Sequence, residues 1–317
     1  MFFFANYTWQ NILVALAVLI SLVVLNEITR RFKWAALVMY LIVPIALTIF
    51  VWPKTAVRGS GDWFPIVKTL SALAGVLGFM VIRYTKAGQN KWVLLFPFVI
   101  LAVNIAEAVY RDIEVFMTYA GKPGVFNEID GLFMQGGPWN IMNAVAGIFL
   151  ILTITGWFGI RVANTKSKDM IWPDQLWFWV VAYDLWNLSY CYNCISTRAM
   201  YAGFLLLISC TIAEFFIERG AYLQHRAQTL ALWAMFSVTF SNYANPDSAF
   251  GSLFSITSSN KPEALWVIAT LSLAFNAGLF VFMIYKSVKA KRNPYTKDLY
   301  TDMKTYQRVL EINGLAK

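Results

Sequence analysis

Long apolar runs separated by short polar segments dominate this chain. An apolar run of about 20 residues is long enough to cross the roughly 30 Å hydrocarbon core of a bilayer as a helix. The pattern predicts nine such spans, at residues 9–29, 34–52, 64–84, 92–118, 138–161, 173–195, 200–218, 227–244 and 263–286. We therefore expect an all-α, polytopic transmembrane helical bundle of about nine spans, occupying residues 1–292.

Basic residues are concentrated in every second connection between the predicted spans. They are Arg30, Arg31, Lys33, Arg83, Lys86, Lys91, Arg161, Lys166, Lys168, Arg219, Arg226, Lys286, Lys289, Lys291 and Arg292. The intervening connections hold fewer, among them Lys54, Lys122, Arg198 and Lys261. Because cytoplasmic loops carry an excess of Lys and Arg, this alternation predicts an external N-terminus and a cytoplasmic C-terminus.

Residues 293–317 form a separate, more polar tail. Leu299, Met303, Tyr306 and Leu310 recur at helical spacing, with basic residues nearby. This pattern predicts a short amphipathic helix in a cytoplasmic tail, lying on the inner leaflet.

Composition supports a multi-pass protein whose surroundings are the lipid bilayer. The chain is 59% hydrophobic and 14% charged, whereas soluble domains carry about 25% charged residues. Its net charge of +9 lies in short loops rather than in one basic patch, so we expect no nucleic-acid partner. Three cysteines and one histidine indicate neither a disulfide framework nor a haem or metal site, and no cofactor is expected.

The sixth predicted span contains an aspartate. Asp184 lies 11 residues after Pro173, about 16 Å along a helix, and therefore near the middle of the bilayer. A carboxylate at that depth costs at least ~2.5 kcal/mol, so it normally faces the protein interior and has a function. The residues that continue its polar face toward the outer surface are Tyr183, Asn187, Tyr190 and Asn193.

Other predicted spans place polar residues at a similar depth, in the outer half of the membrane. They are Lys68, Asn104, Glu107, Arg111, Asn140 and Asn143. Glu107 and Arg111 are four residues apart and can pair within one helix. Together these residues predict an outward-facing polar pocket around Asp184. Asn and Tyr also serve as hydrogen-bonding contacts between membrane helices, so interhelical packing is the alternative interpretation.

The predicted pocket favours a transporter or permease-like protein that binds a small polar solute. Asp184 could balance a cation or carry a proton, which would make transport proton- or cation-coupled. A second hypothesis is a membrane thiol/quinone oxidoreductase using Cys191 and Cys194, although such enzymes need a further cysteine pair. A non-catalytic sensor or complex subunit, including a homo-oligomer, is a third. Transport is favoured over catalysis, and no catalytic residue is assigned.

Several segments also resemble a known family. They are residues 52–55 (WPKT), 71–78 (SALAGVLG), 136–140 (GGPWN), 168–174 (KDMIWPD), 182–187 (AYDLWN) and 224–226 (QHR). With these segments the chain resembles, over nearly its whole length, an uncharacterised family of bacterial multi-span inner-membrane proteins. The resemblance implies a multi-pass protein of the bacterial inner (cytoplasmic) membrane. It implies no activity, ligand or catalytic residue.

Overall fold

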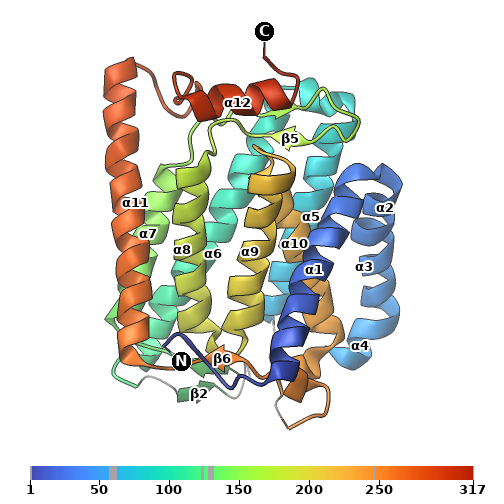
Figure 1. Cartoon of the computed structure of the whole chain (residues 1–317), viewed down its shortest axis with the longest axis vertical. Helices are drawn as coiled ribbons and strands as arrows, with labels where there is room; N and C mark the ends of the chain where they lie inside the picture. Colours follow the sequence, from blue (N-terminus) through green and yellow to red (C-terminus); the bar gives the residue numbers. More distant parts are fainter. Residues whose placement is uncertain (1, 57–62, 123–124, 128–131, 246, 317) are drawn as a thin grey trace.

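The computed structural model describes residues 2–56, 63–122, 125–127, 132–245 and 247–316, and this part of the chain is mainly helical. Long helices stand side by side in a bundle, with the two termini at opposite ends (Figure 1). We call the end that carries the C-terminal helix α12 (Lys304–Ile312) the C-terminal face. The opposite end, where strands β1 (Phe4–Ala5) and β6 (Thr257–Ser258) pair, is the N-terminal face.

The first half of the chain contributes helices α1 to α6. They are α1 (Trp9–Arg31), α2 (Lys33–Leu37), α3 (Val43–Ala46), α4 (Trp52–Thr55), α5 (Trp63–Tyr84) and α6 (Phe96–Tyr119). The π-helical turns Val38–Ile42 and Leu47–Val51 join α2, α3 and α4 into one continuous rod. Short 3₁₀ turns at Lys86–Gln89 and Val93–Leu95 connect α5 to α6.

The second half contributes the remaining helices. They are α7 (Pro138–Leu152), α8 (Trp177–Cys194), α9 (Leu206–Ile212), α10 (Tyr222–Thr239), α11 (Pro262–Ala290) and α12. The π-helical segments Ala199–Leu205 and Ala213–Ile217 extend α9 at both ends. Further 3₁₀ turns occur at Ser196–Arg198, Ser241–Ala244 and Gly251–Phe254. Besides β1–β6, the antiparallel pairs are β2 (Val125–Asn127) with β3 (Leu132–Met134), and β4 (Arg161–Val162) with β5 (Met170–Ile171).

Six segments among the described residues are long and apolar enough to cross a membrane. They are Trp9–Arg31, Lys33–Thr55, Pro65–Tyr84, Val93–Tyr119, Ser196–Ile217 and Pro262–Ala290. Helices α7, α8 and α10 stand beside them in the bundle but are shorter or more polar (Figure 1). Most residues of α8 and α10 are buried in protein, so their polar side chains need not face lipid. The structure thus supports a multi-pass membrane protein, while the count of nine spans and the orientation of the termini stay predictions.

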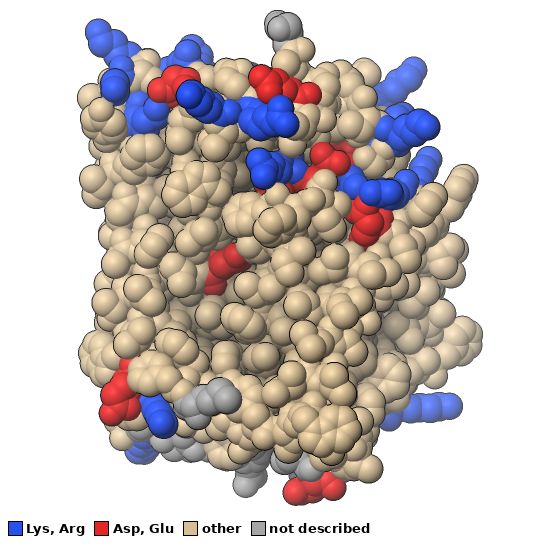
Figure 2. Space-filling view, in the orientation of Figure 1, with Lys and Arg blue, Asp and Glu red and all other residues tan. Residues whose placement is uncertain are grey.

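The outer surface of α1 shows how the bundle meets lipid. Ile12, Leu16, Ile20, Val24 and Ile28 recur every four residues and are all exposed. This spacing places them on one face of the helix, as expected for side chains that contact acyl chains. The charged side chains visible in Figure 2 gather mostly at the C-terminal face, and the band across the middle of the molecule is almost uncharged.

Several predicted spans differ from the helices at the C-terminal face. The fifth predicted span ends at Leu152, and the sixth begins at Trp177 rather than at residue 173. The intervening residues 153–176 form a connection whose two ends, residues 153–156 and 169–176, are buried by protein, while Asn164, Lys166 and Lys168 between them are exposed. The indole of Trp172, for example, donates to the backbone oxygen of Thr155 at 3.0 Å. Helix α10 begins at Tyr222 rather than at residue 227, which brings Arg226 into the helix.

The C-terminal tail packs onto this connection. The backbone N–H groups of Gly156 and Trp157 donate to the oxygens of Pro294 and Tyr295, at 2.8 and 2.9 Å. On α12, Tyr306, Val309 and Leu310 are buried in an apolar cluster. Other members of that cluster are Ala163, Ile171, Leu176, Ala221 and Met283. The division of the chain into domains at residue 292 stays a prediction.

Candidate functional site

The most unusual polar side chain inside the bundle is Arg226 on α10, which is only 5% exposed. Its Nε donates to the Tyr183 hydroxyl and its Nη2 donates to Asn187 Oδ1, both at 3.2 Å. The guanidinium carbon also lies 5.9 Å from the centre of the Tyr183 ring. Nη1 has no hydrogen-bond partner, and within the described part of the chain Arg226 forms no ion pair. A buried cation with an unused donor is costly unless something else accepts from it.

Arg226 lines a small cavity between α5, α6, α8 and α10. The cavity has a volume of about 40 Å³, and Ser71, Asn104 and Tyr183 contribute polar atoms to its wall. The amide nitrogen of Asn104 donates to the Ile100 oxygen at 2.9 Å, while its Oδ1 is buried without a partner. The volume holds a water molecule or a chemical group of similar size. The cavity therefore offers an unused donor and an unused acceptor to such a group.

An ion pair adjoins this cavity on the side of α5 and α6. Lys68 Nζ lies 2.8 Å from Glu107 Oε2 and donates to the backbone oxygen of Asn104 at 3.2 Å. Lys68 and Glu107 compensate each other's charge, which leaves the guanidinium of Arg226 as the group without a direct counter-ion. Glu107 was expected to pair with Arg111. Instead Arg111 contacts Glu114, at 2.6 Å on the same helix.

Asp184 lies on α8 next to Tyr183 but faces different neighbours. Thr211 donates to its Oδ2 at 2.5 Å and Tyr222 donates to its Oδ1 at 2.6 Å. Both carboxylate oxygens are therefore occupied by hydroxyl groups from α9 and α10. Because α8 starts at Trp177, Asp184 is seven residues, or about 10 Å, from that end rather than about 16 Å.

A second buried carboxylate gathers some of the residues predicted for the pocket. Asp112 on α6 accepts from Asn140 Nδ2 at 3.1 Å and from Asn143 Nδ2 at 2.7 Å. The Cys194 thiol also donates to it, at 3.4 Å. Ser272 of α11 in turn donates to Asn143 Oδ1 at 2.8 Å. This cluster ties α6, α7, α8 and α11 together, so Asn140 and Asn143 do not surround Asp184.

The other predicted residues also divide between these groups. Asn193 is buried next to Asp112, and Tyr190 is buried in the apolar core. Cys191 and Cys194 are both buried free thiols with different partners, since Cys191 faces Asn187 Oδ1 at 3.8 Å. The eleven predicted residues thus form no single pocket. Tyr183 and Asn104 line the Arg226 cavity, and Asn187, Lys68 and Glu107 adjoin it.

The sequence-based site omitted Arg226, Thr211, Tyr222 and Asp112. Arg226 was assigned to a basic loop because the apolar run that follows starts one residue later. A usable signal did exist, since Tyr222, Arg226 and Thr229 are spaced i, i+4 and i+7 and share one helix face. Thr211 lies in an apolar run and has no sequence feature that separates it from a lipid-facing threonine.

A charged network at the C-terminal face holds α10 in place. Asp169, in the connection before α8, lies 2.6 Å from Arg30 Nη1 and 3.5 Å from Arg83 Nη2. It also accepts from Ser167 at 2.5 Å and from Gln224 of α10 at 2.8 Å. Burial alone would raise the pKa of Asp169, but Arg83 and Arg30 outweigh it and hold the pKa below its ordinary value. The network therefore anchors α1, α5 and the start of α10, only one turn before Arg226.

Among the described residues, no group of three or more His, Cys, Asp or Glu is placed to hold a metal ion. Comparisons with curated proteins and with solved structures find no match. The sequence profile of a family of unknown function (DUF5692) matches residues 5–312, nearly the whole chain. This match confirms the resemblance to an uncharacterised family, while a bacterial inner-membrane location stays a prediction. The chain belongs to the DUF5692 family.

Proposed function

We propose that this protein is a membrane permease that binds a small solute at the Arg226 cavity, through an anionic or strongly hydrogen-bond-accepting group. One observation carries the proposal: the guanidinium of Arg226 is buried inside a multi-pass bundle with Nη1 unpartnered at a cavity wall. Buried ionisable groups inside a membrane bundle commonly mark solute or ion pathways. A carboxylate suits this site because guanidinium N–H groups match carboxylate oxygens in geometry.

The hydrogen bonds favour an anion over a cation. Asp184 was expected to balance a cation or carry a proton, but both its oxygens already accept from Thr211 and Tyr222. Arg226, in contrast, is held only by two neutral groups, Tyr183 and Asn187. The solute's charged group therefore belongs next to Arg226, and Asp184 orients α9 against α8 and α10. Proton or cation coupling and an outward opening of the site remain part of the hypothesis.

Transport of anything larger than water requires the helices around the cavity to separate. Helix α9 is suited to such movement because π-helical segments, Ala199–Leu205 and Ala213–Ile217, lie at both its ends. Segments of this type are rare, and they are frequently found at functional positions of helices. Through Thr211, α9 is directly linked to Asp184, one residue from Tyr183 of the cavity wall.

The test is flux in proteoliposomes that contain the purified protein. Uptake of radiolabelled acetate and formate is compared with uptake of methylammonium, a cation of similar size. We expect carboxylate uptake that Arg226→Gln abolishes and Arg226→Lys reduces, because lysine keeps the charge but loses the fork of donors. Arg292→Gln is the matched control, since Arg292 is exposed at the C-terminal face. Methylammonium uptake that depends on Asp184 and not on Arg226, or no uptake of either anion, would contradict the proposal.

The thiol/quinone hypothesis draws no support from the geometry. Cys191 and Cys194 contact Asn187 and Asp112 respectively, and both thiols are buried. A redox pair needs two sulfurs that face each other and an exposed point of attack. The hypothesis would gain support if oxidation by a soluble quinone joined the two thiols in a disulfide, which a count of free thiols would detect.

A further inference from the structure

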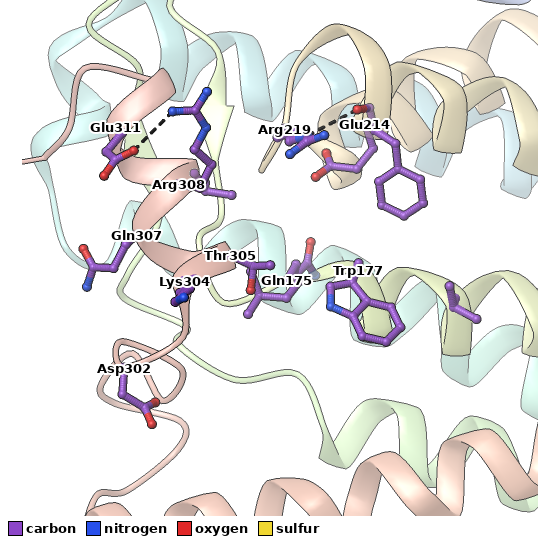
Figure 3. Close-up of a pocket in the computed structure, with 14 residues that line it drawn as sticks. Gln175, Trp177, Glu214, Arg219, Asp302, Lys304, Thr305, Gln307, Arg308 and Glu311 are labelled. Atoms are coloured by element: carbon purple, nitrogen blue, oxygen red, sulfur yellow. Dashed lines mark hydrogen bonds and ion pairs between the residues drawn. The ribbon is translucent and has the colours of Figure 1, made fainter.

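A larger pocket lies at the C-terminal face, outside the Arg226 site. It has a volume of about 810 Å³ and is enclosed by α12, the start of α8 and the end of the π-helical segment after α9 (Figure 3). In Figure 3, Gln175 and Trp177 from the start of α8, Glu214 and Arg219 from the α9 end, and Lys304 and Arg308 from α12 surround one space. Sites of this size hold ligands as large as lipid headgroups with part of their chains.

One wall of this pocket is apolar and continues onto the lipid-facing surface. It is lined by Trp177, Val181 and Phe215. Trp177 is 53% exposed, and Phe216, next to Phe215 in the chain, is exposed as well. Tryptophan is enriched where membrane hydrocarbon meets water, and the pocket lies where the uncharged band meets the charged end (Figure 2). An acyl chain from the adjoining leaflet can therefore reach this wall without leaving the membrane.

The floor of the pocket carries buried polar atoms without partners. Gln175 is 3% exposed, and neither its Oε1 nor its Nε2 makes a hydrogen bond. Glu214 is 4% exposed; its Oε1 accepts from the Gly220 N–H at 2.6 Å, while its Oε2 has no partner. A buried polar atom without a hydrogen-bond partner costs free energy, so we expect each of these atoms to bond to a ligand. Two of the three are acceptors, which suits a ligand that donates from hydroxyl groups.

The rim of the pocket is positively charged. Its acidic residues are already paired, Glu311 with Arg308 at 3.3 Å and Asp302 with Lys286 at 2.7 Å. Among the residues that the structure describes, the Arg219 side chain donates to the backbone oxygen of Phe215, at 3.2 Å, and forms no ion pair. Lys304 makes no ion pair among the described residues. Two cations therefore remain to bind a phosphate at the edge of the membrane.

We propose that this pocket binds an anionic phospholipid whose headgroup carries hydroxyls, of the phosphatidylglycerol type. Its acyl chain lies along Trp177, Val181 and Phe215, and its phosphate contacts Lys304 and Arg219. The headgroup hydroxyls donate to Glu214 Oε2 and Gln175 Oε1. The lipid thereby joins α12 to the ends of α8 and α9, and it does so whether or not Arg226 binds a solute.

Lipid binding is measured by native mass spectrometry of the delipidated protein in detergent. The probes are phosphatidylglycerol, phosphatidylcholine with the same chains, and inorganic phosphate as competitor. We expect phosphatidylglycerol to bind more tightly, and Lys304→Gln and Arg219→Gln each to weaken it about fivefold, as expected for one basic residue near a membrane phosphate. Gln175→Leu should also weaken phosphatidylglycerol and leave phosphatidylcholine unchanged. Lys297→Gln, in the same tail but outside the pocket, is the matched control.

Three outcomes would overturn the assignment. Equal affinity for the two lipids would show that the pocket does not distinguish their headgroups. An equal loss in Lys297→Gln would show only a general effect of net charge. Competition by millimolar inorganic phosphate without any dependence on acyl chains would identify a free anion rather than a lipid as the ligand. Unfolding curves followed by tryptophan fluorescence establish that each variant is folded before its binding is scored.

Discussion

The two hydrogen bonds that Asp184 accepts should contribute a measurable part of the free energy of unfolding. Thr211 and Tyr222 donate to its two oxygens at 2.5 and 2.6 Å, and no other residue described by the structure donates to them. A hydrogen bond to a charged group contributes about 1.5–3 kcal/mol. Thr211→Val and Tyr222→Phe should therefore each lower the free energy of unfolding by about 1.5–3 kcal/mol, because each leaves one carboxylate oxygen without its donor.

A double-mutant cycle separates this bond from general packing. In an Asp184→Asn background the acceptor is neutral, so Thr211→Val should cost about 1 kcal/mol less than it does in the wild type. The assay is unfolding in mixed micelles with increasing SDS, followed by the fluorescence of the protein's 13 tryptophans. Ser209→Ala is the control, because Ser209 also lies on α9 but bonds only to its own helix, at Leu206 O.

Two results would refute the reasoning. Equal costs of Thr211→Val with and without the aspartate would mean that the hydroxyl does not stabilise the carboxylate. Complete loss of carboxylate flux in Asp184→Asn, with unchanged stability, would mean that Asp184 binds the solute or its coupling ion directly.

Further predictions concern Asp169, Asp174 and Gly147. Asp169→Ala removes the carboxylate that Arg83 pairs with and one of the three that pair with Arg30, and it should destabilise the protein by about 3–5 kcal/mol, with exposed Glu311→Ala as control. Since the folded pKa of Asp169 is lowered, the wild type should lose this contribution, measured by SDS unfolding, only as the pH falls below about 4. Burial raises the pKa of Asp174, whose carboxylate accepts from the N–H groups of Leu299 and Tyr300, to about 7. The C-terminal tail should therefore be held less tightly as the pH rises from about 4 to about 7. Amide hydrogen exchange of residues 299–312 should become faster over this range in the wild type, and the increase should be smaller in Asp174→Asn. Gly147→Ala would place its Cβ 2.5 Å from Val109 Cγ2 and 2.7 Å from Trp186 Nε1, and SDS unfolding should show a loss of about 1–3 kcal/mol.

The membrane bundle could be predicted because apolar runs of bilayer length depend on one physical requirement, the burial of backbone polar groups in lipid. The same signal misplaced the start of α8. Residues 172–176 adjoin the apolar run of α8 and are all buried, yet they include Asp174 and Gln175 and are covered by the tail, with Asp174 bonded to the tail backbone. Hydropathy does not distinguish burial in protein from burial in lipid, so the depth of Asp184 was overestimated.

The partners of the charged residues could not be predicted from spacing. Glu107 and Arg111 are placed to pair on one helix, but Lys68 reaches Glu107 from α5 and Arg111 turns to Glu114. The partners of Arg226 could not be predicted from spacing either. An arginine beside an apolar run looks like a loop residue, and only the folded structure shows that it is buried in α10 and bonded to Tyr183 and Asn187 of α8.

We infer that Arg226 Nη1 binds an anionic or hydrogen-bond-accepting group that enters its cavity. Bromide is a small monovalent anion that a crystal reveals by anomalous scattering, and it tests this claim most directly. We expect an anomalous peak within hydrogen-bonding distance of Arg226 Nη1, in the cavity that Asn104 and Tyr183 also line, and we expect no such peak in Arg226→Gln. Peaks confined to exposed lysines and arginines, with none beside Arg226, would contradict it.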